Sequence, residues 1–429
     1  MQTIVKGTFY RLIYMVFSFL TGLLISGLAG KELFGTISLF SLNAALLILI
    51  SGMGHDASLY WHRSSGKLNP ARALGYGWLV TAQQLIFFLL ASICSWLFFN
   101  RLLLSQMPLK FFPLEAAYFT GLILTERYIV FFYSSGKATE CNKILSLLGF
   151  LTILFPASAY LLMSDYVQAA LPLFCIIPLV HGVVLMIAFH IMFSYPDFAF
   201  PRRSELSSLF NFSFIVFITN VVQFLAYRID YWMINYFTSG KEQVGLYAQA
   251  SRFAQLLWVI PNIIAAIIYH ELSLANKASG KAMLSGLIRS INLFNLLFTP
   301  LLVLATWILV NFFLSEYIAS FRIFLFLLLG IFLFCYTILL AAYFSASKQL
   351  WINLCISVCC LMIISFLDLL FIPTFGIEGA AWAQTISYGA SGLTYLIIFC
   401  IREKVSPAQM MIPRKSDLLA VKSLIFKKQ

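Results

Sequence analysis

The sequence predicts an all-α integral membrane protein with about twelve transmembrane helices in two pseudo-symmetric six-helix lobes. Hydrophobic residues make up 61% of the 429 positions and charged residues only 10%, which is more apolar surface than a water-soluble domain can bury. The apolar residues form long runs, and one short loop motif recurs close to halfway along the chain. We therefore expect a duplicated helical bundle whose solvent is lipid.

Twelve apolar runs approach or exceed the roughly 20 residues that a span of the bilayer needs. The first run begins near Phe9 and is too long for the core of a cleavable signal peptide. It carries Ser18, Gly22 and Ser26 at four-residue spacing, which favours close helix packing. The predicted spans are residues 9–29, 35–55, 73–99, 113–134, 142–163, 169–193, 207–237, 244–272, 285–314, 319–344, 350–372 and 379–400.

The duplication is seen in two loop motifs. Residues 30–35 read Gly-Lys-Glu-Leu-Phe-Gly and residues 240–245 read Gly-Lys-Glu-Gln-Val-Gly, 210 positions later. The Ser-Gly-Lys sequence at residues 65–67 returns at residues 279–281. The two Ser-Gly-Lys segments fall between predicted spans, and each Gly-Lys-Glu segment runs from such a gap into the start of the next span. We expect each Gly-Lys-Glu segment to join the first two helices of a lobe, and each Ser-Gly-Lys segment to lie in a loop on the opposite side.

The distribution of basic residues predicts the orientation. With the N-terminus inside, the inner segments contain 20 lysines and arginines and the outer loops contain five, so the positive-inside rule places both termini in the cytoplasm. Six spans in each half make the halves parallel repeats. We predict lobes at residues 1–195 and 207–400, a cytoplasmic linker at 196–206 and a basic cytoplasmic tail at 401–429.

Several classes of function are disfavoured. The chain has no glycine-rich loop with nucleotide-binding spacing, no pair of histidines four residues apart, and no cysteine spacing typical of zinc or redox sites. We therefore predict neither an enzyme nor a metal site, and no cofactor other than a coupling ion. The formal net charge of +12 lies in short loops, which indicates anionic lipid headgroups as partners and not nucleic acid.

The charged residues within predicted spans are the candidates for function, because a charge at bilayer depth costs about 2.5–3.5 kcal/mol. Arg228 and Asp230 lie on the seventh span and Arg252 on the eighth, at similar depth. Two arginines against one aspartate predict a hydrated cavity or an anionic substrate. The structural alternative is an ion pair between Asp230 and either arginine. His55 and Asp56, at the inner end of the second span, are expected interfacial anchors.

Four further residues in the spans have a functional and a structural interpretation. Arg127 on the fourth span would add to the positive charge of the cavity, and its neighbour Glu126 is a candidate proton carrier. Alternatively, both pair with residues of the inner loops. His181 and Asp368 complete the candidates for coupling to H⁺ or Na⁺, with buried, hydrogen-bonded core groups as the alternative.

Three segments resemble bacterial polysaccharide flippases. They are Arg228-Ile229-Asp230 with residues 240–248 and Arg252, Phe34-Gly35-Thr36 at the start of the second span, and residues 376–381 before the last span. The chain thus resembles the polysaccharide-transporter branch of the multidrug/oligosaccharidyl-lipid/polysaccharide (MOP) flippase superfamily. The resemblance covers essentially the whole chain, although its motifs are short.

The resemblance implies a MATE-like pair of lobes that alternates between inward-open and outward-open states. The implied cargo is an undecaprenyl-diphosphate-linked oligosaccharide of O-antigen, lipopolysaccharide, capsule or exopolysaccharide biosynthesis, moved to the outer leaflet of the bacterial cytoplasmic (inner) membrane. A cationic cavity is thought to hold the diphosphate. Arg228 and Arg252 match it, with Asp230 beside them, and Arg127 fits in kind. The implied partners are membrane lipid and the polymerase and chain-length proteins of the same pathway.

Two alternative functions stay open. A cation-coupled drug or metabolite exporter of the same superfamily would be expected to line its cavity with acidic residues, and the excess of arginine argues against it. An integral-membrane glycan polymerase would need a large outer loop, whereas the longest predicted outer loop here spans residues 100–112.

Overall fold

The computed structural model describes residues 2–162, 167–193, 199–238, 240–274, 277–347 and 349–412, and in these ranges it contains helices and no strands. The predicted all-α class is therefore confirmed. Part of the predicted linker (196–198) and most of the predicted tail (413–429) lie outside the described residues. The chain divides into two compact units, Met1–Phe224 and Leu225–Gln429, and each is considered by itself.

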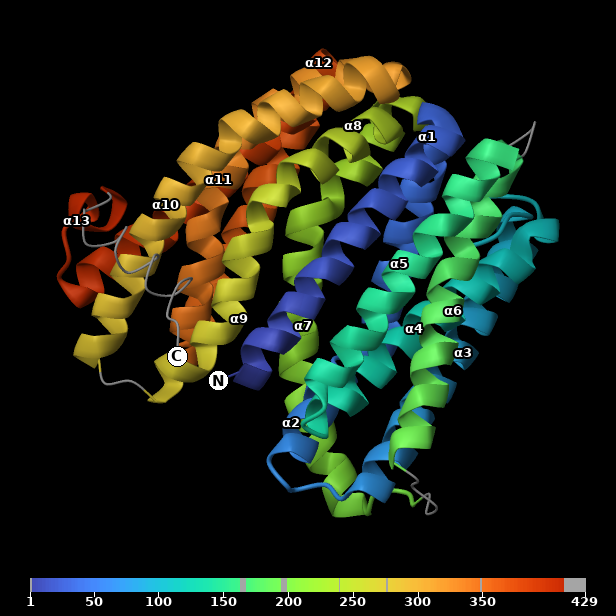
Figure 1. The fold of residues 1–429 in the computed structure, drawn as a ribbon, viewed down its shortest axis with the longest axis horizontal. Coiled ribbons are helices and arrows are strands. Elements are labelled where there is room, and N and C mark those ends of the chain that lie inside the picture. The colour runs from blue at the N-terminus through green and yellow to red at the C-terminus, as the bar shows by residue number, and fades with distance from the viewer. Residues whose placement is uncertain are drawn as a thin grey trace. The chain divides into compact units, whose positions relative to one another are not determined.

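The first unit is formed by six helices and the first part of a seventh (Figure 1). A short 3₁₀ turn, Leu109–Phe111, precedes the fourth helix. The helices are α1 (Gln2–Gly52), α2 (His55–Ser64), α3 (Pro70–Phe99), α4 (Phe112–Ser134), α5 (Ala138–Leu162), α6 (Val167–Phe193) and α7 (Arg203–Thr238).

The second unit begins within α7 and contains the remaining helices. Two 3₁₀ turns, Gln255–Trp258 and Ser315–Tyr317, and one π-helical turn, Leu309–Phe313, interrupt it. The helices are α8 (Lys241–Ala254), α9 (Val259–Leu274), α10 (Lys277–Ile308), α11 (Ile318–Ala346), α12 (Leu350–Glu403) and α13 (Pro407–Met411).

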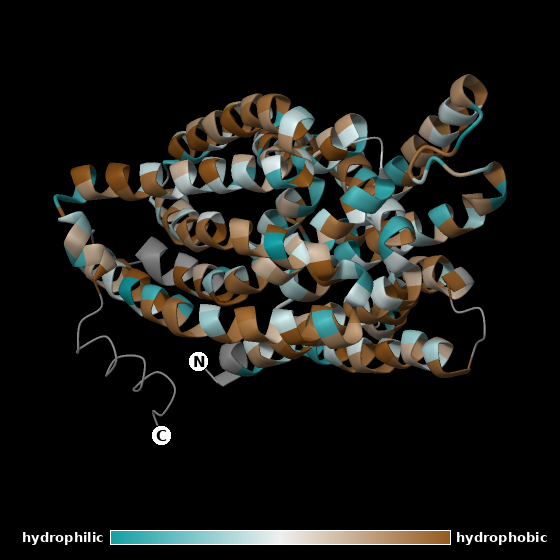
Figure 2. Ribbon diagram, turned by 90° about the horizontal axis from the view of Figure 1, so that it is seen from above, coloured by the Kyte–Doolittle hydropathy of each residue, from teal (hydrophilic) through white to brown (hydrophobic). Residues whose placement is uncertain are grey.

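The described helices account for the twelve predicted spans. Eight are long and apolar enough to cross a membrane, and hydrophobic residues run along them (Figure 2). Two of the eight, α1 and α12, each contain two helices joined at a glycine with positive φ, Gly30 (67°) and Gly376 (59°). The fourth and eighth spans correspond to α4 and to α8 with α9.

Proline explains why the eighth span is broken. The 3₁₀ turn Gln255–Trp258 lies just before α9, and Pro261 is the third residue of that helix. Proline has no amide hydrogen and is tolerated in a first turn, where that hydrogen would have no helical partner. A new helix, α9, therefore begins at Val259, close to Pro261, and α8 ends before it at Ala254.

Small residues allow the helices to approach closely, as the sequence predicts for spans in lipid. In the first unit, a Cβ on Gly121 of α4 would lie 2.3 Å from the backbone nitrogen of Leu179 of α6. In the second unit, a Cβ on Gly392 of α12 would lie 2.1 Å from the carbonyl oxygen of Leu333 of α11. The backbones at both crossings are thus in direct contact.

The repeated motifs are confirmed in part. Gly30 lies at the kink of α1 and Gly240 immediately precedes α8, so both Gly-Lys-Glu segments join consecutive helices. Gly66 lies in the turn between α2 and α3, but the second Ser-Gly-Lys segment, 279–281, lies inside α10. The prediction of a second loop there was wrong. The first copy is followed by Asn69, an N-cap, and Pro70, whereas the second continues into strong helix formers.

One end of α7 is fixed to α2 within the first unit. The Ser58 hydroxyl donates to the Leu209 carbonyl (2.8 Å). Nε2 of His62 lies 3.0 Å from the Ser208 hydroxyl, and Nδ1 of His55 lies 3.0 Å from that of Ser213. From there α7 continues without interruption past residue 224 into the second unit, where it carries Arg228 and Asp230.

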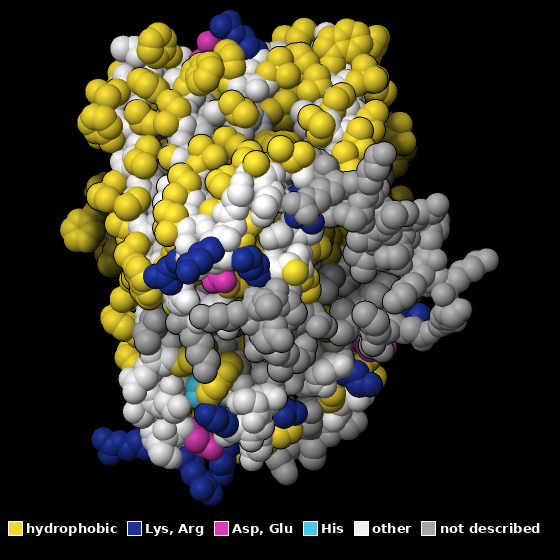
Figure 3. Space-filling model, turned by 90° about the vertical axis from the view of Figure 1, so that its left-hand side faces the viewer, with side chains coloured by type: hydrophobic (Ala, Val, Ile, Leu, Met, Phe, Trp, Pro, Cys, Tyr) yellow, Lys and Arg dark blue, Asp and Glu magenta, His cyan; other side chains and the backbone are white. Residues whose placement is uncertain are grey.

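The surface of the second unit is consistent with a position in a bilayer. On the face shown in Figure 3, hydrophobic side chains cover much of the upper part. Apolar side chains that would be costly to expose to water, such as Phe312 (71% exposed) and Phe366 (62%), lie on this unit's surface. Lipid is the solvent that fits such a surface.

Candidate functional site

Two arginines of the second unit lie near one tyrosine, and one of them contacts it. Arg228 is half-buried on α7. Its guanidinium donates hydrogen bonds to the Tyr231 hydroxyl (3.5 Å) and to Oε1 of Gln255 (3.4 Å). The same guanidinium lies 5.7 Å from the centre of the Tyr231 ring. Arg252 is half-buried in the last turn of α8 and is close enough to interact electrostatically with both Tyr231 and Arg228. We call Arg228, Tyr231 and Arg252 the cationic cluster.

Asp230 faces a different set of partners. Its carboxylate is fully buried and accepts hydrogen bonds from the Tyr247 hydroxyl and from the Tyr231 amide (2.9 Å). Within the described residues, Asp230 and Arg228 do not form the ion pair that the structural alternative supposed. The Arg228 guanidinium donates to neutral oxygens of Tyr231 and Gln255. It interacts with Asp230 only without direct contact.

A buried polar network connects Asp230 to α12. The Tyr247 hydroxyl on α8 lies 3.1 Å from Oε1 of Gln384, and Nε2 of Gln384 donates to the Tyr388 hydroxyl (3.0 Å). Tyr388 in turn contacts the carbonyl of Tyr227 on α7 (3.4 Å). These residues were not predicted as site residues. The four-residue spacing of Gln384 and Tyr388, which places both on one helical face, is the signal that could have found them.

Asp368, on the first helix of α12, is the second buried carboxylate of this region. It is fully buried, and neither of its oxygens has a hydrogen-bond partner among the described residues. Its charge interacts with that of Asp230. Two neighbouring buried carboxylates are costly when both are ionised. A proton or a small cation shared with this pair, which we call the acidic pair, would remove most of that cost.

In the first unit, the positive charge of Arg127 is compensated by a carboxylate. Its side chain is buried, forms an ion pair with Asp56 and donates to Oε1 of Gln84 (2.9 Å). Asp56, expected as an interfacial anchor, is therefore the partner of a buried arginine. The adjacent Glu126 is exposed. This arrangement favours the structural interpretation of Arg127, and the role of Glu126 as a proton carrier stays a prediction.

His181 lies in the core of the first unit. It is 5% exposed, and its ring makes an edge contact with Tyr14, with ring centres 5.8 Å apart. Its nitrogens lie 3.5 Å from the hydroxyls of Tyr14 on α1 and Thr152 on α5. These surroundings favour the structural interpretation, in which a neutral His181 connects three helices, and not the interpretation as a coupling residue.

Comparison with known proteins identifies the fold. A family model described as "Polysaccharide biosynthesis protein" matches residues 157–320, which include Arg228, Asp230 and Arg252. A search of curated proteins gave no match. A MATE transporter of the MOP superfamily in an inward-facing conformation is 13% identical, with 94% of this chain and 98% of that chain covered and a TM-score of 0.65. The chain has the MOP-superfamily transporter fold.

Two further MOP structures agree. An outward-facing MATE transporter is 16% identical, with 94% of this chain and 95% of that chain covered and a TM-score of 0.61. A MOP transporter from Pyrococcus furiosus, whose binding pocket is described as having reverse polarity, is 15% identical, with 95% and 96% covered and a TM-score of 0.61. The predicted resemblance is confirmed: residues 157–320 match the polysaccharide biosynthesis family model, and the solved structures share the MOP fold. At such identities the MOP structures establish the fold, so the functional argument rests on the cationic cluster and the acidic pair.

Proposed function

We propose that this chain is a MOP-type flippase for a lipid-linked oligosaccharide with a diphosphate linkage. The cargo is the undecaprenyl-diphosphate-linked repeat unit of O-antigen, capsule or exopolysaccharide, moved from the cytoplasmic to the outer leaflet. The observation that carries this proposal is the cationic cluster, with two half-buried arginines beside one tyrosine in an apolar bundle. The match of residues 157–320 to polysaccharide biosynthesis proteins supports a glycan cargo.

The chemistry of the cluster fits a diphosphate. Arginine stays protonated, and its planar fork of donors matches the oxygens of a phosphate. The charges of Arg228 and Arg252 interact unfavourably with each other, and each is expensive at bilayer depth. A diphosphate contacting both would compensate the two charges at once. Its polyprenyl tail would remain in lipid while the polar part crosses.

We propose that the acidic pair binds the coupling ion, H⁺ or Na⁺. The Tyr247 hydroxyl, in contact with Asp230 and Gln384, has one hydrogen to donate. It donates to Asp230 when that carboxylate is ionised, and to Gln384 when Asp230 is protonated and itself donates. The network therefore accommodates both states of Asp230. Because Asp230 lies two residues from Arg228, loading of the pair changes the electrostatic field at the cluster.

A complementation experiment tests the cargo. In a strain that lacks its own flippase, the combined Arg228→Gln and Arg252→Gln variant should lose surface glycan and accumulate the lipid-linked repeat unit. The matched control is Arg322→Gln, since Arg322 is an exposed arginine of the same unit, 5.6 Å from the Phe326 ring centre and paired with Glu378. Full surface glycan from the double variant at normal membrane abundance would refute the proposal.

The second candidate is a cation-coupled exporter. It is favoured by the multidrug resistance transporters among the structures of similar fold and by the buried acidic pair, which would suit a cationic cargo. Expression would then protect cells against cationic dyes, and Asp230→Asn or Asp368→Asn would abolish that protection. Dye protection together with unchanged surface glycan in a deletion strain would select the exporter over the flippase.

A further inference from the structure

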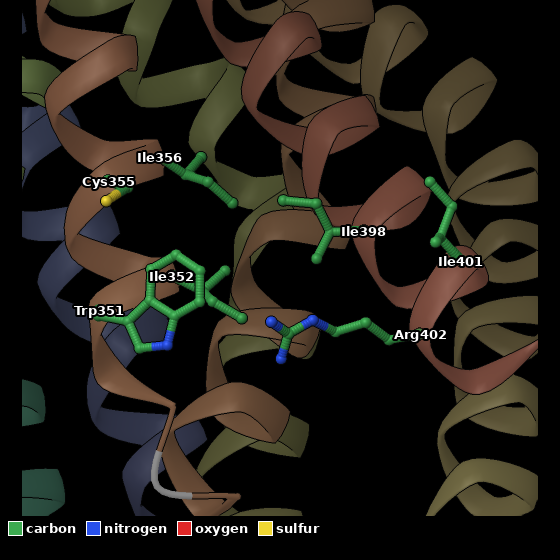
Figure 4. A pocket seen from close by; sticks show the side chains of 7 residues that line it. All are labelled: Trp351, Ile352, Cys355, Ile356, Ile398, Ile401 and Arg402. Carbon is green, nitrogen blue, oxygen red and sulfur yellow. The ribbon is translucent and has the colours of Figure 1, made fainter.

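A pocket lies between the two ends of α12, on the second unit. Its volume is about 300 Å³, at the lower end of the range for ligand sites. The kink at Gly376 turns α12 back on itself, so its first and last turns meet. The first helix contributes Trp351, Ile352, Cys355 and Ile356 and the second contributes Ile398, Ile401 and Arg402 (Figure 4).

The pocket has apolar walls and one charged group. Ile352 and Ile356 form its buried floor, while Trp351 (59% exposed) and Ile401 (71%) lie at its rim. In an apolar bundle such a rim faces lipid. Of the seven lining residues only Arg402 is charged, and its guanidinium extends across the opening toward the helix of Trp351 (Figure 4).

Arg402 is held in position by its neighbours, and several N–H donors of its guanidinium remain available for a ligand. Its guanidinium donates to the Gln349 side chain and lies 5.6 Å from the centre of the Trp351 ring. The adjacent Glu403 is engaged elsewhere, because its carboxylate accepts a hydrogen bond from the Tyr343 hydroxyl (3.0 Å). No ion pair links Arg402 to any acidic side chain that the structure describes. A guanidinium has five N–H donors, and most of them point to no described acceptor.

We propose that this pocket binds an anionic phospholipid, with an acyl chain against the isoleucines and Cys355 and the phosphate on Arg402. Tryptophan and arginine at the ends of spans are typical of headgroup depth, and basic pockets between spans are suited to acidic lipids. Lys404, exposed two residues further on, adds a second positive charge. That charge attracts a net-negative headgroup and repels the ammonium of a zwitterionic one.

Native mass spectrometry of the purified protein tests the proposal. Titration with phosphatidylglycerol or phosphatidylcholine should show the first phosphatidylglycerol bound about five-fold more tightly, the ratio expected for one additional basic contact. Lys404→Gln should remove this preference. Arg402→Gln should weaken the binding of both lipids, because both carry the phosphate that Arg402 contacts, and Arg322→Gln should change neither. Millimolar inorganic phosphate should not displace the lipid, because the acyl chain supplies part of the affinity. Equal binding of the two lipids, persistence of the preference in Lys404→Gln, unchanged binding in Arg402→Gln, or displacement by phosphate would each overturn the proposal.

A second measurement locates the lipid. Phosphatidylglycerol with brominated acyl chains should quench the fluorescence of Trp351, obtained as the difference between the wild type and Trp351→Phe. Ile398→Trp fills the pocket and retains Arg402. If the acyl chain occupies the pocket, this variant should also lose the preference for phosphatidylglycerol in the mass-spectrometry experiment. Quenching that is equal for brominated phosphatidylcholine would refute the site. None of these measurements requires the glycan cargo, so their outcome is independent of the proposed function.

Discussion

At the scale of single residues, burial and pairing separate the charges of this chain into two groups. Arg127 is buried and paired with Asp56, which makes it a structural element of the first unit. Asp368 is equally buried but has no hydrogen-bond partner among the described residues. A buried group whose polar atoms are left unsatisfied costs free energy, and this is the observation on which the proposed ion site at the acidic pair rests.

Removal of the partner of Arg127 should destabilise the first unit. Asp56→Asn leaves a buried guanidinium without its counter-charge, and because Asp56 is 30% exposed we expect a loss of about 2 kcal/mol, below the range for fully buried pairs. Thermal unfolding in detergent measures this. Glu126→Gln, an exposed neighbour, should change stability by less than about 0.5 kcal/mol. An unchanged melting temperature in Asp56→Asn would show that the pair contributes nothing.

Neutralisation of the acidic pair should abolish its response to cations. If Asp230 and Asp368 share a proton or Na⁺, the melting temperature of the wild type should rise as that cation is added, because the ligand binds only the folded state. Asp368→Asn removes the charge with little change in shape and should remove the response. Titration of both proteins with Na⁺ at several pH values makes the comparison, with Glu32→Gln, an exposed carboxylate of α1, as the control. A response that survives in Asp368→Asn would place the coupling ion elsewhere.

At the scale of elements, close backbone contacts position the polar network. Gly392 and Gly330 bring α12 against α11, since a Cβ at either position would lie within 2.5 Å of backbone atoms of the opposite helix. The same segment of α12 carries Gln384 and Tyr388. A displacement of this helix would therefore move the partners of Tyr247.

Two glycines on one face of α12 allow a matched test. Gly392→Ala places a methyl group 2.1 Å from the Leu333 carbonyl oxygen, which is backbone and cannot rotate away. We expect a destabilisation of about 2–3 kcal/mol, as for overpacking in a core. Gly389→Ala meets only the tip of the Leu333 side chain, at 3.3 Å, and should cost less than about 1 kcal/mol. Equal melting temperatures would contradict the contact described for α11 and α12.

The sequence predicts elements better than sites, for a physical reason. The positions of the spans follow from local apolar runs, and the joints at Gly30 and Gly240 follow from a visible repeat. The partners of Asp230 depend on contacts over long sequence separations, since Gln384 lies 137 residues from Tyr247. The pairing of Arg127 with Asp56, 71 residues away, depends likewise on how α2 and α4 pack.

At the scale of the whole molecule, the two halves share a helical arrangement but differ in the charged residues that they bury. The glycine that begins each Gly-Lys-Glu segment joins two consecutive helices, Gly30 within α1 and Gly240 between α7 and α8. The cationic cluster and the acidic pair lie in the second unit. The first unit instead holds the compensated pair of Arg127 and Asp56. We infer that duplication supplied the scaffold and that later divergence of the second half supplied the proposed binding chemistry.

The proposed orientation makes a prediction for the complete protein. With 20 basic residues in the predicted inner segments and five in the outer loops, both termini should be cytoplasmic. A green fluorescent protein fused after Gln429 should fluoresce, and alkaline phosphatase at that site should be inactive. Phosphatase inserted in the chain next to Gly240 should be active, as the matched reporter for the opposite side. The reverse pattern would invert the proposed direction of transport.

The glycine at the turn of α12 also bears on how the chain can be divided. Gly376 has positive φ, and nothing lies within 4 Å of where its Cβ would be, so this turn is held by no side-chain contact at that position. The helix that follows it packs on α11 through Thr385 and Gly392. A covalent link at Gly376 is therefore dispensable for that packing. Fragments 1–375 and 376–429, produced together, should reassemble in the membrane, which would turn the last helix into an exchangeable module.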